Sequence, residues 1–212
     1  IYILSMGPGQ AEQAVKFCLE MGADEGFLIS GRAFGGSDTY ATSYILSRGV
    51  RTVETVENIE FDLILCGKQA IDGDTAQVGP EMAEHLGSPQ ITMALDLYFE
   101  GENLIVKRES REGYDLMTTS FPALVTVLKS NVPPRCATLK TKMAARRKTI
   151  TILTETEMKE INLRHCGLKG SPTRVVSTYV PTVKKTGYIV HRENYEEAAE
   201  ELMTRLREDG VF

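Results

Sequence analysis

Residues 67–78, with the sequence GKQAIDGDTAQV, constrain the fold of this chain more than any other stretch. They follow a short apolar run at residues 61–66 that the pattern predicts to be a buried strand. They lead into residues 80–87, where proline suits the first position of a helix and glycine the position after its end. In α/β proteins, a strand, a small-residue loop and a helix start offer backbone N–H groups to phosphate. The segment therefore predicts a nucleotide phosphate site, and a tight turn without a ligand is the alternative.

The first half of the sequence alternates predicted strands with predicted helices. The strand patterns are at residues 2–4, 26–30 and 61–66. Residues 10–21 carry a helical apolar stripe, and Ser37 or Asp38 is expected to cap a second helix. Such alternation predicts a parallel sheet with helices on both faces, which binds ligands at the carboxyl ends of its strands. The glycine-containing loops that leave this edge are at residues 6–7, 31–38 and 67–79.

From residue 90 the pattern changes to short strands joined by turns. The expected antiparallel strands are residues 91–99, 104–107 and 116–120. Residues 121–128 are apolar enough to return to the main sheet. Residues 162–190 carry apolar side chains without periodicity, which predicts an arm that lies on another subunit, and residues 195–207 predict a last helix. The predicted fold is α/β: a Rossmann-like, doubly wound, mostly parallel sheet with an antiparallel hairpin extension and a C-terminal arm ending in a helix.

Composition excludes several classes of function. The 212 residues carry a net charge of −5, which argues against a nucleic-acid partner. No apolar run approaches the roughly 18 residues of a transmembrane helix, so no membrane insertion is expected. The four cysteines have no CxxC spacing, which argues against a zinc or iron–sulfur site and fits reduced thiols in a cytoplasm. The chain has neither a Ser-His-Asp order nor metal-ligand spacing, so we expect no catalytic side chain and no metal.

Several motifs carry a resemblance to one family. GKQAID followed by GDTAQ, at residues 67–77, looks like the adenine-nucleotide loop of the β subunit of electron transfer flavoprotein. Further matches follow in the family's order: SMGP at 5–8, MGAD at 21–24, VKR to FPAL at 106–124, PRCATLK at 134–140 and GLKGSPT at 167–173. The resemblance covers essentially the whole chain. It implies that roughly the first quarter of the family's chain, with a strand and a further nucleotide-contacting loop, is missing from this sequence.

The resemblance implies a binding role for the loop, since in flavin chemistry the cofactor carries out the redox reaction. Ala70 and residues 75–78 would face the phosphates, and Asp72 would bind a sugar hydroxyl or fix the loop. Met6 matches a nucleotide-contacting position of the family, with ordinary core packing as the alternative. The expected cofactor-binding residues are Met6, Gly67, Lys68, Gln69, Ala70, Ile71, Asp72, Gly73, Asp74, Thr75, Ala76, Gln77 and Val78.

The family's commonest form has Asp-Asp-Asp-Cys-Asn-Gln-Thr-Gly where residues 72–79 here read DGDTAQVG. This version is similar to that of bifurcating members from anaerobes, in which a second FAD replaces AMP. The small residues Gly73 and Ala76 would leave room for the flavin. The expectation is therefore FAD, with AMP in a plain electron carrier as the alternative. A stand-alone nucleotide-sensing α/β domain is the alternative of another class.

A bifurcating member implies a set of partners. NADH would donate electrons to FAD held by this chain, and ferredoxin or flavodoxin would receive one of them. The other would pass through the FAD of an obligate α subunit to an acyl-CoA dehydrogenase or enoyl-CoA reductase. Residues 1–160 would form the nucleotide- or flavin-binding domain, and residues 161–212 an arm and helix embracing the α subunit in the cytoplasm.

Residues 135–148 form a basic, amphipathic segment, and such a segment binds either a membrane surface or an acidic protein. The resemblance favours protein docking, with Leu139 as an anchor that enters an acyl-CoA dehydrogenase and with Arg135 and Lys140 beside it. The alternative is a solvated helix with Leu139 in the chain's own core.

Overall fold

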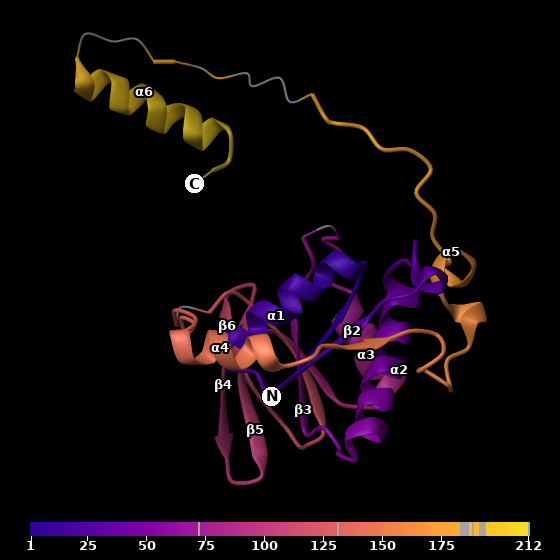
Figure 1. Ribbon diagram of the computed structural model, residues 1–212. Coiled ribbons are helices and arrows are strands. Elements are labelled where there is room, and N and C mark those ends of the chain that lie inside the picture. The colour runs from indigo at the N-terminus through magenta and orange to yellow at the C-terminus, as the bar shows by residue number, and fades with distance from the viewer. Residues whose placement is uncertain (72, 131, 183–186, 188, 191–193, 212) are drawn as a thin grey trace. The chain divides into compact units, whose positions relative to one another are not determined.

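A computed structural model describes the chain except for residues 72, 131, 183–186, 188, 191–193 and 212. The described chain consists of two compact units, Ile1–Arg174 and Val175–Phe212. The first unit is a mixed α/β structure, and the second contains the last helix (Figure 1). The α/β fold class predicted from the alternating pattern is confirmed.

The first sheet is entirely parallel, with strand order β1-β2-β8. Its strands are β1 (Tyr2–Met6), β2 (Glu25–Ile29) and β8 (Thr151–Leu153). Successive residues of β2 face opposite sides, as a strand requires. Leu28 packs with Val15 and Leu19 of α1 (Glu12–Glu20), whereas Phe27 and Ile29 pack with residues of α2 (Thr39–Glu57). Helices therefore cover both faces of this sheet, as expected.

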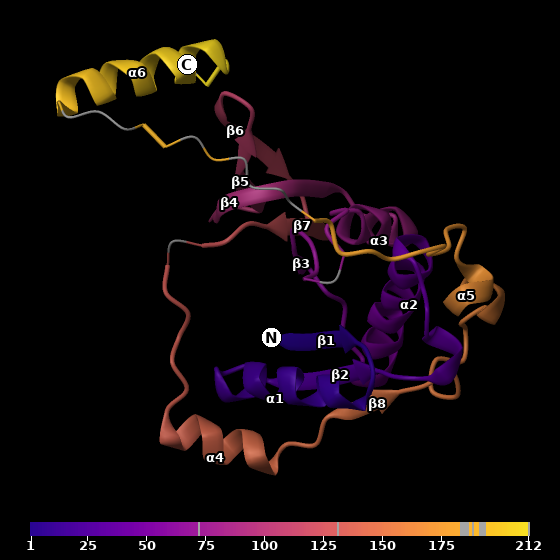
Figure 2. The same ribbon diagram turned by 90° about the horizontal axis from the view of Figure 1, so that it is seen from above.

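The second sheet has the order β3-β7-β4-β5-β6. The strands β3 (Leu63–Gly67), β7 (Ala123–Val127) and β4 (Gln90–Glu100) are parallel, and β5 (Asn103–Ser110) and β6 (Gly113–Thr119) extend the sheet antiparallel. On one face, Leu124 packs with Met82 and Leu86 of α3 (Val78–Leu86), which lies beside α2 (Figure 2). On the other face, Val125 packs with Leu104 and Val106 of β5. The antiparallel extension therefore covers the face that a helix covers in a doubly wound sheet.

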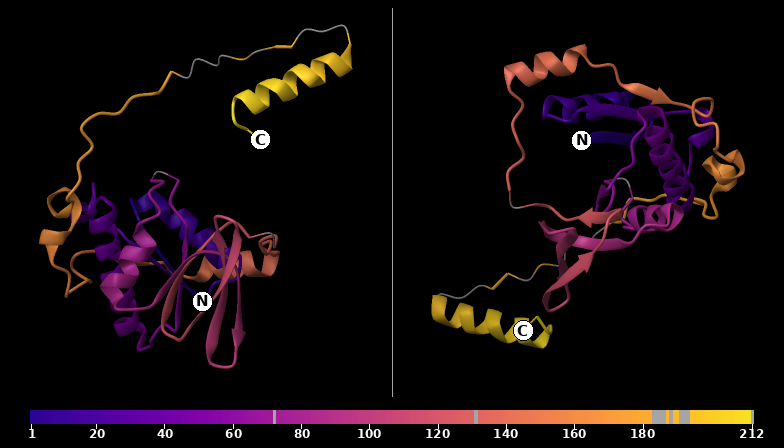
Figure 3. Two further views of the ribbon diagram at one scale, coloured as in Figure 1. Left: turned by 180° about the vertical axis from the view of Figure 1, so that it is seen from behind. Right: turned by 90° about the horizontal axis from the view of Figure 1, so that it is seen from below.

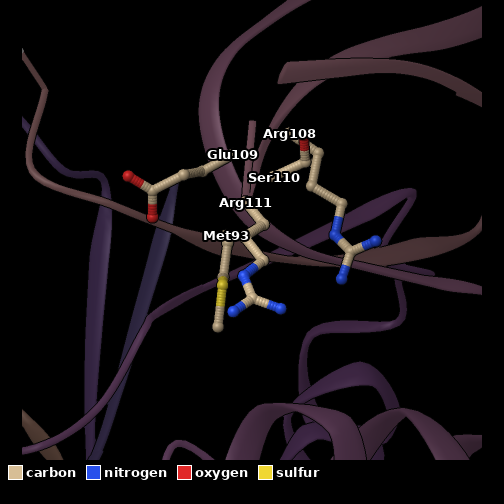
Figure 4. A pocket seen from close by; sticks show the side chains of 5 residues that line it. All are labelled: Met93, Arg108, Glu109, Ser110 and Arg111. Carbon is tan, nitrogen blue, oxygen red and sulfur yellow. The ribbon is translucent and has the colours of Figure 1, made fainter. Parts of the chain in front are cut away.

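A corner in β4 makes this covering possible. The register shifts between Ile91 and Ala94, and Met93 has a φ of +59°, which is unusual for a residue with a side chain. The Met93 N–H donates to Thr126 Oγ1 at 3.0 Å, and Arg108 Nε–H donates to the Thr92 carbonyl at 3.2 Å. These two bonds hold the bulge that redirects β4. The corner encloses a pocket of about 500 Å³ lined by Met93, Arg108, Glu109, Ser110 and Arg111 (Figure 4).

The segment after β7 leads to α4 (Leu139–Arg147), which lies beside α1 (Figures 2 and 3). Ala145 is the buried residue of α4 and packs with Val15 and Leu19. Thr138 and Thr141 form a capping box at the start of this helix. The short helix α5 (Gly167–Gly170) follows buried Cys166, and the second unit contains α6 (Tyr195–Glu208).

Two expectations about helix starts need correction. Pro80 is the third residue of α3 rather than its first, because residues 78 and 79 already have helical geometry. Proline is tolerated there since the N–H groups of a helix's first turn have no partner within the helix. The basic helix expected across residues 135–148 begins only at Leu139, so Arg135 precedes it. Of the two residues proposed to cap α2, Asp38 is the one whose side chain accepts from Ala41.

Candidate functional site: the loop between β3 and α3

The β3–α3 loop, residues 67–78, starts where the parallel strands end. Gly67 lies opposite Val127, the last residue of β7, and the Lys68 N–H donates to the Val127 carbonyl at 3.0 Å. The loop therefore leaves the carboxyl end of β3 beside the carboxyl end of β7. Open α/β sheets bind ligands at this edge.

Most side chains of the loop are open to solvent. The exposed loop residues are Gly67, Gln69, Ala70, Ile71, Gly73, Asp74, Thr75 and Gln77. Ile71 is fully exposed, which is unusual for a large apolar side chain, and nothing lies within 4 Å of a Cβ built on Gly73. Asp72, the expected sugar contact, lies outside the described residues. The loop thus has free space around it and an apolar side chain that a ligand or partner could cover.

The end of the loop has a backbone suited to an anion. Ala76 has a φ of +55°, and Gln77 returns to right-handed dihedrals with φ −98° and ψ −31°. A change of hand between neighbouring residues can aim successive N–H groups at one point, as in anion-binding nests. None of the described side chains caps α3, so the N–H groups of its first turn remain available at the positive end of the helix. These features fit the phosphate of a nucleotide.

A close contact holds α3 in this position. Gly79 is buried, and a Cβ built on it would lie 2.5 Å from Thr126 Cγ2. Only glycine lets the first turn of α3 come so near to β7. Thr126 also accepts the Met93 N–H, so one buried threonine supports both the helix start and the β4 corner. Figure 4 shows Arg108 and Glu109 at this corner pointing in opposite directions, as successive strand residues do.

Two polar residues that sequence reasoning missed adjoin the end of the loop. Thr39, the first residue of α2, places its hydroxyl 3.4 Å from Gln77 Oε1 and 3.4 Å from Glu81 Oε1. The other carboxylate oxygen of Glu81 is buried and has no hydrogen-bond partner among the described residues. A ribose hydroxyl or a water molecule could supply that donor. The only indication of this contact in the sequence is that the helix beginning near Thr39, like the one that contains Glu81, is predicted to start at the carboxyl edge of the sheet.

Met6 ends β1, opposite Ile29 in the first sheet. Its side chain is partly buried against the core around Phe27 and Ile45. It therefore lies at a carboxyl strand end, as the β3–α3 loop does, but in the other sheet. A role for Met6 beside an adenosine stays a prediction.

The basic segment presents an exposed apolar pair. Leu139 is 77% exposed and Met143, one turn further along α4, is 50% exposed. Lys140 is exposed beside them, and Arg135 extends over the end of α1, with a guanidinium nitrogen 3.5 Å from a Cβ built on Gly22. Ala145 is the residue that attaches α4 to the core. The alternative in which Leu139 belongs to the chain's own core is therefore wrong.

Two of the four thiols, Cys66 and Cys166, are only weakly acidic. Burial raises the pKa of Cys66 to about 11 and that of Cys166 to about 11, so both remain protonated. Among the described residues, no group of three His, Cys, Asp or Glu side chains is placed to hold a metal ion. No helix in the described ranges is long and apolar enough to cross a membrane.

The fold and the loop define a Rossmann-like α/β protein with a helix start exposed at the carboxyl edge of its sheet. The chain belongs to the electron transfer flavoprotein β-subunit family: the model of the electron transfer flavoprotein domain matches residues 1–158. The electron transfer flavoprotein subunit beta of Thermoanaerobacterium thermosaccharolyticum is 42% identical over 213 residues, covering 100% of this chain and 79% of the relative.

Two further relatives are named as subunits of CoA-reductase systems. The caffeyl-CoA reductase–Etf complex subunit CarD of Acetobacterium woodii is 38% identical over 100% of this chain and 79% of its own length. The acryloyl-CoA reductase electron transfer subunit gamma of Anaerotignum propionicum is 39% identical over 99% of this chain and 78% of its own length. Subunits of this family pair with an α subunit.

Proposed function

We propose that this chain is the β subunit of a bifurcating electron transfer flavoprotein that holds FAD on the β3–α3 loop. It accepts electrons from NADH in the cytoplasm and divides them between ferredoxin or flavodoxin and the FAD of an α subunit. From there electrons pass to an acyl-CoA dehydrogenase or enoyl-CoA reductase. The bound flavin supplies the redox chemistry, and this chain binds and orients it.

The observation that carries the proposal is the uncapped start of α3 behind the left-handed Ala76. The backbone N–H groups of Ala76 to Gly79 would bind the pyrophosphate, with Lys68 near it. Gly73 and Ala76 add little volume, and the space around Gly73 is open, which supports a ligand larger than AMP. Glu81 would accept a hydrogen bond from the sugar. AMP in a plain electron carrier remains the competing proposal for the same loop.

The second unit supports pairing with an α subunit. Val175, Val176, Tyr179 and Val180 are each more than 80% exposed, and no described residue of α6 is buried. An amphipathic helix with no buried described residue and a strap of exposed apolar side chains are features that a partner surface would cover. This argues against a stand-alone nucleotide sensor. We assign nucleotide binding to residues 1–160 and partner binding to the arm, residues 161–212.

The dehydrogenase contact is assigned to α4. Leu139 and Met143 form an exposed apolar pair, Lys140 and Lys142 lie on the same helix, and Arg135 precedes it in the chain. A small apolar anchor within a charged rim is typical of a transient docking surface. The names of the relatives from Acetobacterium woodii and Anaerotignum propionicum support a CoA-thioester reductase as the electron acceptor.

Acid extraction of the purified heterodimer, followed by chromatography of the released nucleotides, tests the proposal. Two FAD per heterodimer supports it, whereas one FAD with one AMP supports the plain carrier and refutes bifurcation. Gel filtration of this chain expressed alone tests the third possibility. A well-behaved monomer that binds ATP would support the sensor.

A further inference from the structure

The base of the arm, residues 166–173, is hydrogen-bonded to the loop between β2 and α2 (residues 31–38). We call this set of hydrogen bonds the lock. The Gly167 N–H donates to Ser37 Oγ at 3.0 Å. The Asp38 N–H donates to Ser171 Oγ at 2.8 Å, and the same hydroxyl donates to the Gly167 carbonyl at 2.8 Å. Residues 130 or more positions apart are therefore joined by bonds between a backbone N–H and a serine hydroxyl.

Asp38 is the centre of this junction, because its two carboxylate oxygens serve different elements. Oδ1 accepts the Ala41 N–H at 3.0 Å and so caps α2. Oδ2 accepts both the N–H of Thr173 at 2.9 Å and its hydroxyl at 2.8 Å. A carboxylate that accepts three donors in this way is a strong and directional connection.

The backbones at the junction are too close for side chains. Gly167 has a φ of +60°, and a Cβ there would clash with the carbonyl oxygen of Ala33. Gly36 has a φ of +74°, and a Cβ there would lie 2.6 Å from Leu168 Cγ. Cys166, next to Gly167, is 3% exposed and belongs to the core that contains Phe34. The base of the arm is thus shaped to fit this loop.

The junction ends where the second unit begins. Thr173 is bonded to Asp38, Arg174 is the last residue of the first unit, and the exposed apolar segment starts at Val175. The point at which the chain leaves the first unit is therefore fixed by the bonds to Asp38. When one end of a binding segment is already fixed, the segment loses less conformational entropy on binding.

We propose that Asp38 is a positioning residue for partner binding: it holds the base of the arm so that residues 175–212 start from a fixed point when they engage the α subunit. The inference rests on the proposed function for its partner, but the lock itself is a property of this chain alone. The carboxylate of Asp38 binds Ala41 and Thr173 of this chain, so it acts on the arm through Thr173.

Asp38→Asn separates the two tasks of this residue. Asparagine caps helices as well as aspartate does, so α2 keeps its cap. Its amide nitrogen, however, replaces Oδ2 opposite the Thr173 N–H, which then loses its acceptor. Thr173→Val removes the hydroxyl donor from the other side, and Thr173→Ser keeps both donors and is the matched control.

Two readouts distinguish failure of the lock from failure of the proposed function. The first is the rate at which iodoacetamide labels Cys166 in the full chain alone, measured by peptide mass spectrometry with exposed Cys136 as reference. The second is the dissociation constant for the α subunit. We expect Asp38→Asn and Thr173→Val to raise both by about tenfold or more, as loss of a hydrogen bond to a charged group predicts. Each disrupting variant should keep a single cooperative melting transition, and both readouts should be unchanged in Thr173→Ser.

Unchanged Cys166 labelling in both disrupting variants overturns the lock. Faster labelling with unchanged partner affinity overturns its role in positioning the arm. If the wild-type chain forms no heterodimer, the proposed function fails, while the labelling rates still decide whether the lock exists.

Discussion

Ala76 and Met93 hold left-handed backbone conformations that L-residues other than glycine, asparagine and aspartate seldom adopt. Such a conformation costs about 1–3 kcal/mol and persists only where its surroundings impose it. At Met93 the reason is structural, because the Thr126 hydroxyl holds its N–H and the corner of β4 depends on it. At Ala76 none of the described side chains plays this part, and the residue lies just before the start of α3. The conformation of Ala76 therefore supports the proposed phosphate site.

Leu139→Ala tests the docking anchor. Because the side chain is 77% exposed, its loss should change the free energy of unfolding by no more than about 0.5 kcal/mol. The affinity for the dehydrogenase should fall roughly thirtyfold, which corresponds to about 2 kcal/mol, and electron delivery to it should fall accordingly. Leu153→Ala is the core control, since Leu153 is 1% exposed, and it should cost about 2–5 kcal/mol.

NADH oxidation with an artificial dye acceptor completes the Leu139 test, because the dye bypasses docking. Normal dye reduction with lost dehydrogenase coupling supports the anchor. Loss of both activities in Leu139→Ala would show that the side chain serves the subunit's own structure.

Asp38 gives the junction a defined pH dependence. Burial raises its pKa, but the N–H of Ala41 and the two donors of Thr173 outweigh burial and leave the pKa below the usual 3.8. A carboxyl group with a lowered folded-state pKa stabilises the protein above its unfolded pKa and loses that effect as pH falls through the folded value. The urea midpoint of wild type should therefore exceed that of Asp38→Asn at pH 7, and the difference should shrink below pH 3.8. A difference that is constant from pH 7 to pH 3 would contradict this origin.

Among the elements, the strand–loop–helix order of the first half could be predicted, because each strand is a short apolar run and each helix has one apolar face. The split into two sheets and the folding of β5 over β7 could not. The folding of β5 over β7 depends on the corner at Met93, and the register shift there is held by Thr126 and Arg108, residues distant in sequence. The position of α3 likewise depends on Gly79 meeting Thr126, a contact that no local pattern encodes.

Gly79→Ala tests the contact that places the start of α3. Its Cβ would lie 2.5 Å from Thr126 Cγ2, so the helix or β7 must shift, at a cost of about 1–3 kcal/mol despite alanine's better helix propensity. Gly73→Ala is the matched control in the same loop, because nothing lies within 4 Å of its Cβ. Thr126→Ser removes the clashing methyl group and should partly rescue Gly79→Ala in a denaturation series. Equal stability of the Gly73 and Gly79 variants would contradict the close contact.

At the scale of the whole molecule, the loop that forms the candidate site could be predicted from sequence because its ligand-binding groups are consecutive. Thr39 and Glu81 could not, since they meet only when α2 and α3 pack together. The arm was expected from apolar residues without periodicity, but its attachment through Asp38 and Thr173 was not. Polar contacts over such sequence separations leave no periodic signal.

Removal of residues 175–212 tests the division of labour between the two units. The first unit keeps its own core clusters, so a chain ending at Arg174 should retain a cooperative thermal transition close to that of the full chain. Association with the α subunit, followed by analytical ultracentrifugation, should be lost. Full association of the shortened chain would contradict the assignment of the arm to partner binding.

The central claim is that the β3–α3 loop itself selects FAD, and the flavin count of a loop variant tests it most directly. The variant carries Gly73→Asp, Thr75→Cys and Ala76→Asn, which fill the loop with the larger residues of the family's commonest form. Asparagine tolerates the left-handed conformation at position 76, so the fold should be retained. We predict two FAD per heterodimer in the wild type and one FAD in the variant, with AMP in place of the other. Two FAD in both proteins, or one FAD with AMP in the wild type, would contradict the account.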